Sequence, residues 1–243
     1  MTNSTAHDIH APWWNAVSNT IAEAEKNMIA FRRDLHRHPE ASGQEYRTTR
    51  RVVETMQAAG LEPVQLEDDR GLLLDIDLGA PEGHYIAIRA DLDCVQIQDQ
   101  KTTDWRSAHD GLCHACGHDA HTTMALHTAM AMHEHVGVLR LLEANANIRF
   151  IFQPAEEDCT GAQDMIRQHA VEGVRSILAV HVDPYLECGS IGLKAGPITA
   201  NCVSFRIIVN GDGGHSARPY QSIDPIPAAV NMVSLMYQLC PRS

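Results

Sequence analysis

The stretch Tyr85-Ile-Ala-Ile-Arg-Ala-Asp-Leu-Asp93 decides how this chain folds. Its first six residues form a compact, mostly apolar run, which is typical of a strand buried inside a sheet. Two carboxylates, Asp91 and Asp93, follow where the run ends. Sites in open α/β sheets form at the carboxyl ends of the strands. The stretch therefore predicts a buried strand that delivers two acidic side chains to such an edge.

Further strands and helices alternate along the chain on both sides of this stretch. Apolar or alternating runs predict strands over residues 64–66, 72–78, 147–152 and 176–182. Apolar positions at three-to-four spacing predict helices over residues 14–38, 45–58, 120–136 and 161–169. Strands that alternate with helices indicate an α/β fold, here with a mixed, largely parallel sheet flanked by helices.

The pattern of residues along the sequence changes near residues 194–197, and we place a domain boundary there. Beyond it, residues 203–209 alternate like a strand with one exposed face, and residues 224–239 have the spacing of a helix. This second part is too short to bury a core of its own. We therefore expect a larger domain over residues 1–195 and the beginning of a smaller, incomplete α/β domain over residues 196–243.

The composition excludes several classes of partner. The 243 residues carry a formal net charge of −12 without a basic stripe, which argues against a nucleic-acid partner. No run approaches the ~18 apolar residues of a membrane-spanning helix, and the first residues lack the features of a secretory signal. Seven cysteines, an odd number, fit reduced thiols better than a disulfide framework. We therefore expect a cytoplasmic protein that contacts no membrane.

Metal-binding chemistry concentrates in His114-Ala-Cys-Gly-His-Asp-Ala-His121, which holds three imidazoles, a thiol and a carboxylate. In Cys116-Gly-His118 the glycine lets the backbone turn, so that a thiolate and an imidazole converge on one metal ion. This pair suits zinc, and histidine with carboxylates also admits manganese, cobalt or nickel. One alternative is a buried cysteine beside surface histidines. Cys113 and Cys116 could instead form half of a zinc knuckle, although a second cysteine pair at zinc-finger spacing is absent, or a redox pair, although the stretch does not open the first helix of a thioredoxin-like unit.

Two further strand ends supply candidate groups. Glu156-Glu157 follows the predicted strand 147–152 and a proline. Adjacent side chains there point in different directions, so one can bind metal while the other faces a water molecule. The alternative is a solvated pair at the N-terminus of the next helix, where negative charge is favoured. His181 ends a third predicted strand at the same edge, although a lone histidine of this kind is more often a core residue.

A glycine-rich segment, Gly211-Asp-Gly-Gly-His215, occurs in the second part of the chain. It lacks the lysine and hydroxyl residue of a P-loop and the spacing of a dinucleotide-binding fingerprint. Two glycines before a histidine can present that imidazole on a tight turn. The alternative is a plain hairpin turn without a chemical role.

Five motifs occur in order: Leu35-His-Arg-His-Pro-Glu40, Ile88-Arg-Ala-Asp-Leu-Asp93, His114-Ala-Cys-Gly-His-Asp119, Phe152-Gln-Pro-Ala-Glu-Glu157 and Gly213-Gly-His-Ser-Ala-Arg-Pro219. With them, the chain from about residue 28 onward resembles the metallo-amidohydrolases that include N-acyl-amino-acid amidohydrolases (aminoacylases), hippurate hydrolase and plant auxin-conjugate hydrolases. The resemblance implies a zinc-peptidase-like catalytic domain with two divalent metal ions, which would be zinc, manganese, cobalt or nickel. It also implies a smaller lid domain through which two copies form a homodimer.

The resemblance assigns a role to each site residue. The implied metal ligands are Cys116, His118, Glu157 and His181. Glu156 would be the general base, and His215, in the lid, would stabilise the oxyanion. The carboxylates that would support the ligands from behind are Asp91, Asp93 and Asp119. The implied reaction is metal-dependent hydrolysis of the amide bond of a small N-acyl amino acid or a related amino-acid conjugate.

The chain departs from the family pattern in two ways. Cys94-Val-Gln96, Cys113 and Asp158-Cys-Thr160 replace residues that are usual in the family, but no catalytic residue is lost. Family members also continue through the rest of the lid and supply a further metal-ligating histidine. We therefore expect a C-terminally truncated chain. The alternative function is a non-catalytic dimerisation or metal-binding fragment of such an enzyme.

Overall fold

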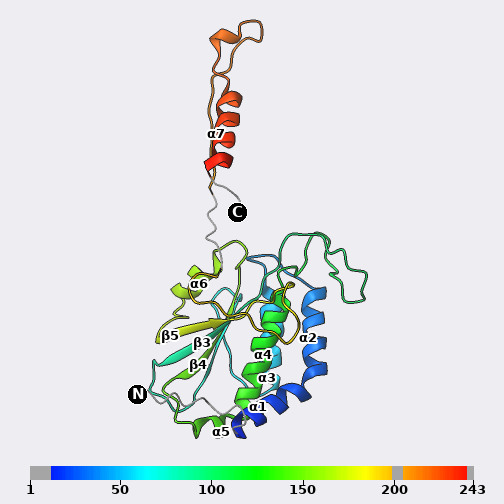
Figure 1. Cartoon of the computed structure of the whole chain (residues 1–243), viewed down its shortest axis with the longest axis vertical. Helices are drawn as coiled ribbons and strands as arrows, with labels where there is room; N and C mark the ends of the chain where they lie inside the picture. Colours follow the sequence, from blue (N-terminus) through cyan, green and yellow to red (C-terminus); the bar gives the residue numbers. More distant parts are fainter. Residues whose placement is uncertain (1–11, 199–204, 240–243) are drawn as a thin grey trace. The chain divides into compact units, whose positions relative to one another are not determined.

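The computed structural model describes residues 12–198 and 205–239 of the chain. The chain divides into two compact units, Met1–Tyr185 and Leu186–Ser243 (Figure 1). The helices of the first unit are α1 (Pro12–Glu23), α2 (Glu25–Arg37), α3 (Tyr46–Ala58), α4 (His118–Glu134), α5 (Val136–Arg140) and α6 (Gly161–Arg167). Its strands are β1 (Val64–Gln65), β2 (Leu72–Ile76), β3 (Tyr85–Asp91), β4 (Asn147–Gln153) and β5 (Val174–Ala179).

The five strands form one sheet in the order β1-β2-β4-β3-β5. β3 pairs in parallel with β4 and β5, whereas β2 pairs antiparallel with β1 and β4. The apolar stretch that begins at Tyr85 is therefore an interior strand, as its sequence predicts. The expected α/β fold with a mixed sheet flanked by helices is confirmed.

The parallel register brings the carboxyl ends of β3, β4 and β5 to one edge of the sheet. Asp91, the last residue of β3, lies beside Gln153, the last residue of β4. Arg89 lies beside Ala179, the last residue of β5. Asp91 lies two residues after Arg89, and His181 lies two residues after Ala179. Both therefore lie at the same edge of the sheet. This shared edge is where a site is expected in an open α/β sheet.

The main core lies between one face of the sheet and helices α2, α3 and α4. Side chains alternate along β2, and those at Leu72, Leu74 and Ile76 are buried in this core. The helices contribute fully buried side chains: Leu35, Val52, Met56 and Leu126. Burial of each such aliphatic side chain contributes about 1.5–3 kcal/mol relative to exposure. A smaller cluster around Met165 of α6 covers part of the opposite face.

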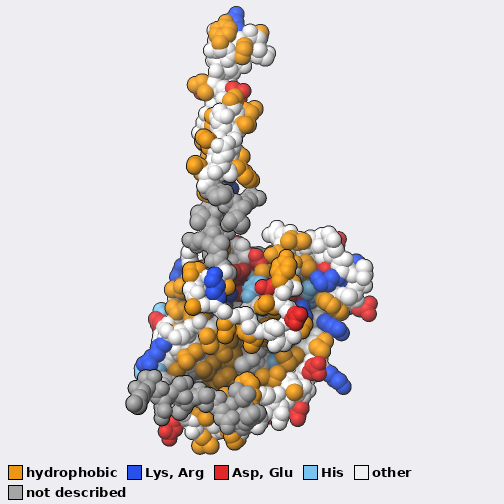
Figure 2. All heavy atoms as spheres, in the orientation of Figure 1, with side chains coloured by type: hydrophobic (Ala, Val, Ile, Leu, Met, Phe, Trp, Pro, Cys, Tyr) orange, Lys and Arg blue, Asp and Glu red, His pale blue; other side chains and the backbone are white. Residues whose placement is uncertain are grey.

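β5 lies at the edge of the sheet and is poorly covered. Ile177 is 50% exposed and Leu178 is 61% exposed. Figure 2 shows hydrophobic side chains gathered at the surface in the region of the strands. Because apolar packing around β5 is sparse, the residues that follow it depend on hydrogen bonds to other elements for their position.

Several predicted elements of the first unit have other limits in the structure, and two of these differences lie beside contacts with distant residues. The helix expected over residues 14–38 is divided at Ala24, whose ψ of −3° departs from helical geometry, and Thr20 of α1 bonds His135 at 2.8 Å. The strand expected over residues 176–182 ends at Ala179. Beyond it, the Val182 amide donates to the ring of His121 instead of to a neighbouring strand. Both differences lie beside contacts between residues far apart in sequence.

The second unit contains a short 3₁₀ helix, η1 (Pro219–Gln221), and α7 (Pro225–Leu239). The strand expected over residues 203–209 is absent from its described part, residues 205–209, and residues 203 and 204 lie outside the described residues. No described strand of this unit lies alongside that segment, so no sheet pairing is available to it. No described side chain of this unit is buried.

The boundary expected near residues 194–197 lies inside the second unit. The assignment of residues 1–195 to a catalytic domain and of residues 196–243 to a lid stays a prediction. Across the described ranges 12–198 and 205–239, none of the helices has both the length and the apolar character needed to cross a membrane.

The loop between β3 and α4 is anchored by Asp99, which is buried. Its carboxylate accepts the amide N–H groups of Lys101 and Ser107 at 3.0 and 2.9 Å, and it lies 3.3 Å from the Nε2 atom of His36. Burial alone would raise the pKa of Asp99, but these amide groups and the Lys101 ammonium outweigh burial and hold it below its ordinary value.

Replacing Asp99 with asparagine should lower the free energy of unfolding by about 1.5–3 kcal/mol at pH 7, because charged hydrogen bonds are lost. A carboxylate with a lowered pKa in the folded state stabilises the fold above its unfolded pKa of about 3.9, and this contribution is lost as pH falls through the folded-state value. Urea unfolding at pH 7 and in acid measures the effect. Asp110→Asn, an exposed change in the same loop, is the control. If the wild type and Asp99→Asn differed in unfolding free energy by the same amount at both pH values, this role of the Asp99 carboxylate would be contradicted.

Candidate metal centre

The predicted ligands and the predicted base meet at the sheet edge in the first unit. The N-terminus of α4 supplies Cys116 and His118, the segment after β4 supplies the two glutamates, and His181 follows β5. The Cys116 Sγ atom lies 3.3 Å from the Nε2 atom of His181. One donor atom each from Cys116, His118 and His181 lies within 4.8 Å of the others. Thiolate and imidazole at this spacing fit a divalent cation.

A second donor group shares His118. Its Nε2 atom lies 3.8 Å from Glu156 Oε2 and 3.7 Å from Glu157 Oε1. Asp91 Oδ2 lies 3.7 Å from the same nitrogen. Three carboxylates therefore surround one imidazole nitrogen. This concentration of negative charge suits a divalent cation, which would offset the repulsion among the carboxylates.

Asp93 sets the orientation of His118. The Nδ1 atom of His118 lies 3.0 Å from the Asp93 carbonyl oxygen and 3.1 Å from Asp93 Oδ1. Both oxygens accept, so Nδ1 carries the proton and Nε2 keeps its lone pair toward the glutamates. Carboxylate–histidine pairs of this kind orient metal-binding imidazoles.

The Asp93 carboxylate also joins two other segments. Its Oδ2 atom accepts the Ser42 hydroxyl at 2.7 Å and the Glu157 amide at 2.9 Å. Burial alone would raise the pKa of Asp93, but the bonds from His118, Glu157 and Ser42 outweigh it and lower this pKa. For His118, burial acts against the charged ring, yet the bond to Asp93 and the charge of Asp91 raise its pKa overall.

Replacing Asp93 with asparagine should weaken metal binding about 10- to 100-fold. An asparagine amide has one acceptor oxygen, so it cannot accept from His118 on one side and from Ser42 and Glu157 on the other. Calorimetric titration with Zn²⁺ measures the change. Asp158→Asn is the control, because Asp158 is exposed and bonds only Thr160 among the described contacts. Unchanged affinity in the Asp93 variant would contradict its positioning of His118.

The carboxylates also raise the pKa of two groups that face them, Glu156 and Cys116. Burial, together with the negative charges of Asp91 and Glu157, raises the pKa of Glu156. Burial and the charge of Glu157 raise the pKa of the Cys116 thiol to about 12. A carboxylate with a raised pKa is a stronger base than an ordinary glutamate. A thiol in these surroundings becomes a thiolate when a nearby cation offsets the carboxylates.

Gly117 controls the approach of the two histidine-bearing segments. Its φ of 89° is left-handed, and a Cβ atom there would lie 2.2 Å from Val182 Cγ2. Only glycine adopts this φ without strain and also leaves room for the Val182 side chain. The expected turn at Cys116-Gly-His118 is confirmed, and it also admits the segment that carries His181.

Sequence reasoning missed two residues that hold Asp91. Arg89 forms an ion pair with Asp91 Oδ1 and donates to Gln153 at 3.0 Å. His121 places its Nδ1 atom 3.3 Å from Asp91 Oδ2. His121 follows His118 by three residues, so a shared helix face was the available signal.

Two of the predicted site residues have contacts that do not involve the candidate ligands. Asp119 lies 2.8 Å from His36 Nδ1 and accepts from Arg32 at 3.2 Å, so its carboxylate faces α2. His215 belongs to the second unit, where its Nδ1 atom accepts the Ala217 amide at 3.1 Å. The roles of both residues stay predictions.

The two cysteines of the redox alternative belong to different groups. Cys113 is buried beside His36 and Asp99, whereas Cys116 lies with His118 and His181. All five cysteines in the described part of the chain are free thiols. This separation gives a Cys113–Cys116 redox pair no support.

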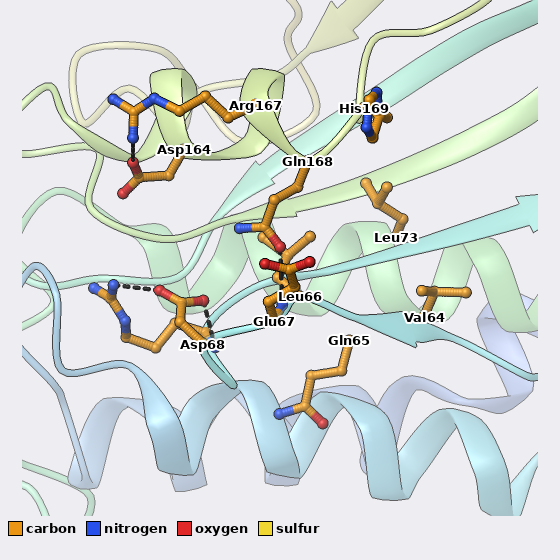
Figure 3. A pocket seen from close by; sticks show the side chains of 11 residues that line it. Val64, Gln65, Leu66, Glu67, Asp68, Leu73, Asp164, Arg167, Gln168 and His169 are labelled. Carbon is orange, nitrogen blue, oxygen red and sulfur yellow. Dashed lines mark hydrogen bonds and ion pairs between the residues drawn. The ribbon is translucent and has the colours of Figure 1, made fainter.

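A hollow of about 790 Å³ lies between β1 and α6, away from the metal ligands (Figure 3). Two ion pairs lie along it, between Arg70 and Asp68 and between Arg167 and Asp164. None of the metal-ligand candidates lines it. We therefore locate the candidate active site at the sheet edge and not in this hollow.

Comparison with known proteins identifies relatives of this arrangement. The chain is 41% identical over 219 residues to an N-acetylcysteine deacetylase of Bacillus subtilis, covering 89% of this chain and 56% of that protein. It is 36% identical over 227 residues to an N-acyl-L-amino acid amidohydrolase of Geobacillus stearothermophilus, covering 93% and 60%. The crystal structure of a dinuclear metal binding peptidase from Bacillus subtilis matches with a TM-score of 0.66 at 38% identity, covering 72% of this chain and 48% of that one.

The chain spans little more than half the length of these two sequence relatives. The model of peptidase family M20/M25/M40 matches residues 87–238, which include every candidate metal ligand. The chain belongs to peptidase family M20/M25/M40.

Proposed function

We propose that the protein hydrolyses the amide bond of a small N-acyl amino acid or a related amino-acid conjugate, with two divalent metal ions. The observation that carries this proposal is the meeting of Cys116, His118 and His181 beside Glu156 and Glu157. Metal-binding peptidases and N-acyl amino acid hydrolases among the relatives support it.

The ligands in this proposal are Cys116, His118, Glu157 and His181. Two bound divalent ions would polarise the amide carbonyl and lower the pKa of a water molecule from ~15.7 toward ~7. Zinc fits the thiolate and imidazole donors best, while the carboxylates also admit manganese, cobalt or nickel.

Glu156 is the general base in this mechanism. Its side chain is 39% exposed, against 26% for Glu157, whose amide is tied to Asp93. Glu156 is therefore the more accessible of the two carboxylates to water. Its raised pKa favours acceptance of the proton from the attacking water and its delivery to the leaving amine.

His215 is the oxyanion donor in this mechanism. Because its Nδ1 atom accepts the Ala217 amide, the neutral ring carries its proton on Nε2. That N–H is the donor which a developing oxyanion requires, and a donor of this kind is usually worth ~3–4 kcal/mol.

The proposal also includes a catalytic domain over residues 1–195, and a lid over residues 196–243 that forms a homodimer. The free thiols of the described residues fit the expected cytoplasmic location.

An assay panel tests the proposal. The chain is loaded with Zn²⁺, Mn²⁺, Co²⁺ or Ni²⁺ and mixed with N-acetyl, N-benzoyl and indole-acetyl amino acids. We expect release of the free amino acid, its loss with a chelator, and its return when metal is restored. Metal uptake without hydrolysis of any substrate would instead favour a metal-binding or dimerisation fragment. Hydrolysis that survives the chelator would contradict metal dependence.

A further inference from the structure

His121 is a buried residue that uses both of its ring nitrogens. Its Nε2 atom lies 3.0 Å from the backbone nitrogen of Val182. A backbone N–H only donates, so Nε2 is the acceptor and the proton of the neutral ring resides on Nδ1. Nδ1 faces Asp91 Oδ2 at 3.3 Å, and this carboxylate accepts. His121 therefore connects the end of β3 to the segment that follows β5.

The Val182 peptide links His121 to His181. The Val182 N–H donates to His121, and the Val182 carbonyl lies 2.7 Å from His181 Nδ1. The carbonyl only accepts, so His181 carries its proton on Nδ1 and leaves Nε2 free to face Cys116 at 3.3 Å. The rings of His121 and His181 also pack edge to face, with centroids 4.6 Å apart. Both the backbone and the ring of His181 thus depend on this contact.

No regular secondary structure in the described residues beyond β5 holds this segment. β5 ends at Ala179, and Val180 and Val182 are 63% and 39% exposed. The described residues from 180 to 198 contain no helix or strand. A single buried acceptor at the end of an edge strand therefore has a large effect on where His181 lies.

We propose that His121 is a positioning residue, which fixes the Val182 peptide and thereby directs His181 Nε2 toward Cys116. This inference rests on the proposed function in that His181 is taken as a metal ligand. The tether itself is a property of the polypeptide, and it can be measured without metal.

Two substitutions separate the two contacts of His121. In His121→Gln, the amide oxygen can occupy the Nε2 position and still accept the Val182 amide. In His121→Asn, the amide nitrogen replaces Nδ1 and can donate to Asp91, but no acceptor reaches Val182. His127→Asn is the matched control. His127 is a buried histidine of the same helix whose Nδ1 atom contacts the Thr123 carbonyl at 2.9 Å.

The first measurement is hydrogen exchange of the Val182 amide in the full chain before metal is added. We expect exchange about tenfold faster in His121→Asn than in the wild type, and near-normal exchange in His121→Gln and His127→Asn. The second is titration with Co²⁺, followed by the thiolate-to-cobalt absorption of Cys116. Affinity should fall about 10- to 100-fold in His121→Asn, and it should stay within about threefold in the other two variants.

The outcomes distinguish the two proposals. Wild-type exchange and wild-type cobalt affinity in His121→Asn would overturn the positioning role. Equal losses in His121→Gln and His121→Asn would also overturn it, because acceptance from Val182 would not be the cause. If Val182 exchange follows the expected order while no variant, including the wild type, binds Co²⁺, the tether stands and the metal-dependent function fails.

Discussion

Replacing Glu156 with glutamine should lower kcat about 10²- to 10⁴-fold in the metal-loaded protein, while the metal content stays the same. Glutamine has nearly the size of glutamate, so the surrounding ligands keep their positions. It has no basic oxygen that can accept the proton of the attacking water. Hydrolysis of an N-acyl amino acid and metal analysis of the same sample measure the two quantities.

The pH dependence gives a second readout for Glu156. A general base acts only when ionised, so the wild-type rate should fall as pH drops through the pKa of Glu156. Without metal, burial and the charges of Asp91 and Glu157 raise that pKa, and bound divalent cations would act in the opposite direction. The limb should be absent from the residual rate of Glu156→Gln.

Glu157→Gln provides the contrast for this prediction. It should weaken metal binding, because Glu157 is taken as a ligand. Near-normal hydrolysis by Glu156→Gln would contradict the assignment of Glu156 as the general base. Metal loss in Glu156→Gln equal to that in Glu157→Gln would instead make Glu156 a ligand.

Replacing Gly117 with alanine should reduce metal affinity about 100-fold or more. The left-handed φ of 89° costs an alanine about 1–2 kcal/mol. In addition, the new Cβ atom would lie 2.2 Å from Val182 Cγ2, so the segment that carries His181 must move. Displacement of His181 would remove one proposed ligand from the group of Cys116, His118 and His181. Titration with Zn²⁺ and thermal unfolding measure the two effects separately.

Gly111→Ala is the control for backbone strain. Gly111 also has a left-handed φ of 76°, but a Cβ atom there would have no neighbour within 4 Å. It should therefore show a similar loss of stability with normal metal affinity. Val182→Ala combined with Gly117→Ala removes the clashing methyl groups and should recover part of the affinity, as a coupled pair requires. Equal affinity in Gly111→Ala and Gly117→Ala would contradict the steric account.

Much of the first unit could be predicted from local sequence. The run from Tyr85 to Asp91 predicts an interior strand because a strand covered on both sides is apolar throughout. The helix predicted over residues 45–58 is α3, which ends at Ala58, and Gly60 with a left-handed φ follows two residues later. The candidate ligands could also be selected, because each one follows a predicted strand or lies in a metal-binding motif.

Other features could not be read from local patterns. The apolar spacing of residues 14–38 continues through Ala24, where α1 and α2 are divided, and Thr20 of α1 contacts His135 nearby in the chain's first unit. The apolar run that includes β5 continues past Ala179, yet the Val182 amide bonds His121 instead of another strand. Both outcomes depend on partners distant in sequence, to which hydrophobic periodicity is blind.

By itself, the sequence determined the interior strand, the α/β class and which side chains offer metal-binding chemistry, because apolar periodicity and residue type are local properties. Only the tertiary structure decided which nitrogen of each histidine is free. The tautomers of His118 and His181 follow from Asp93 and the Val182 carbonyl, and that of His121 from the Val182 amide. Hydrogen-bond partners of this kind are supplied by strand register and helix packing, which bring together residues that are far apart along the chain.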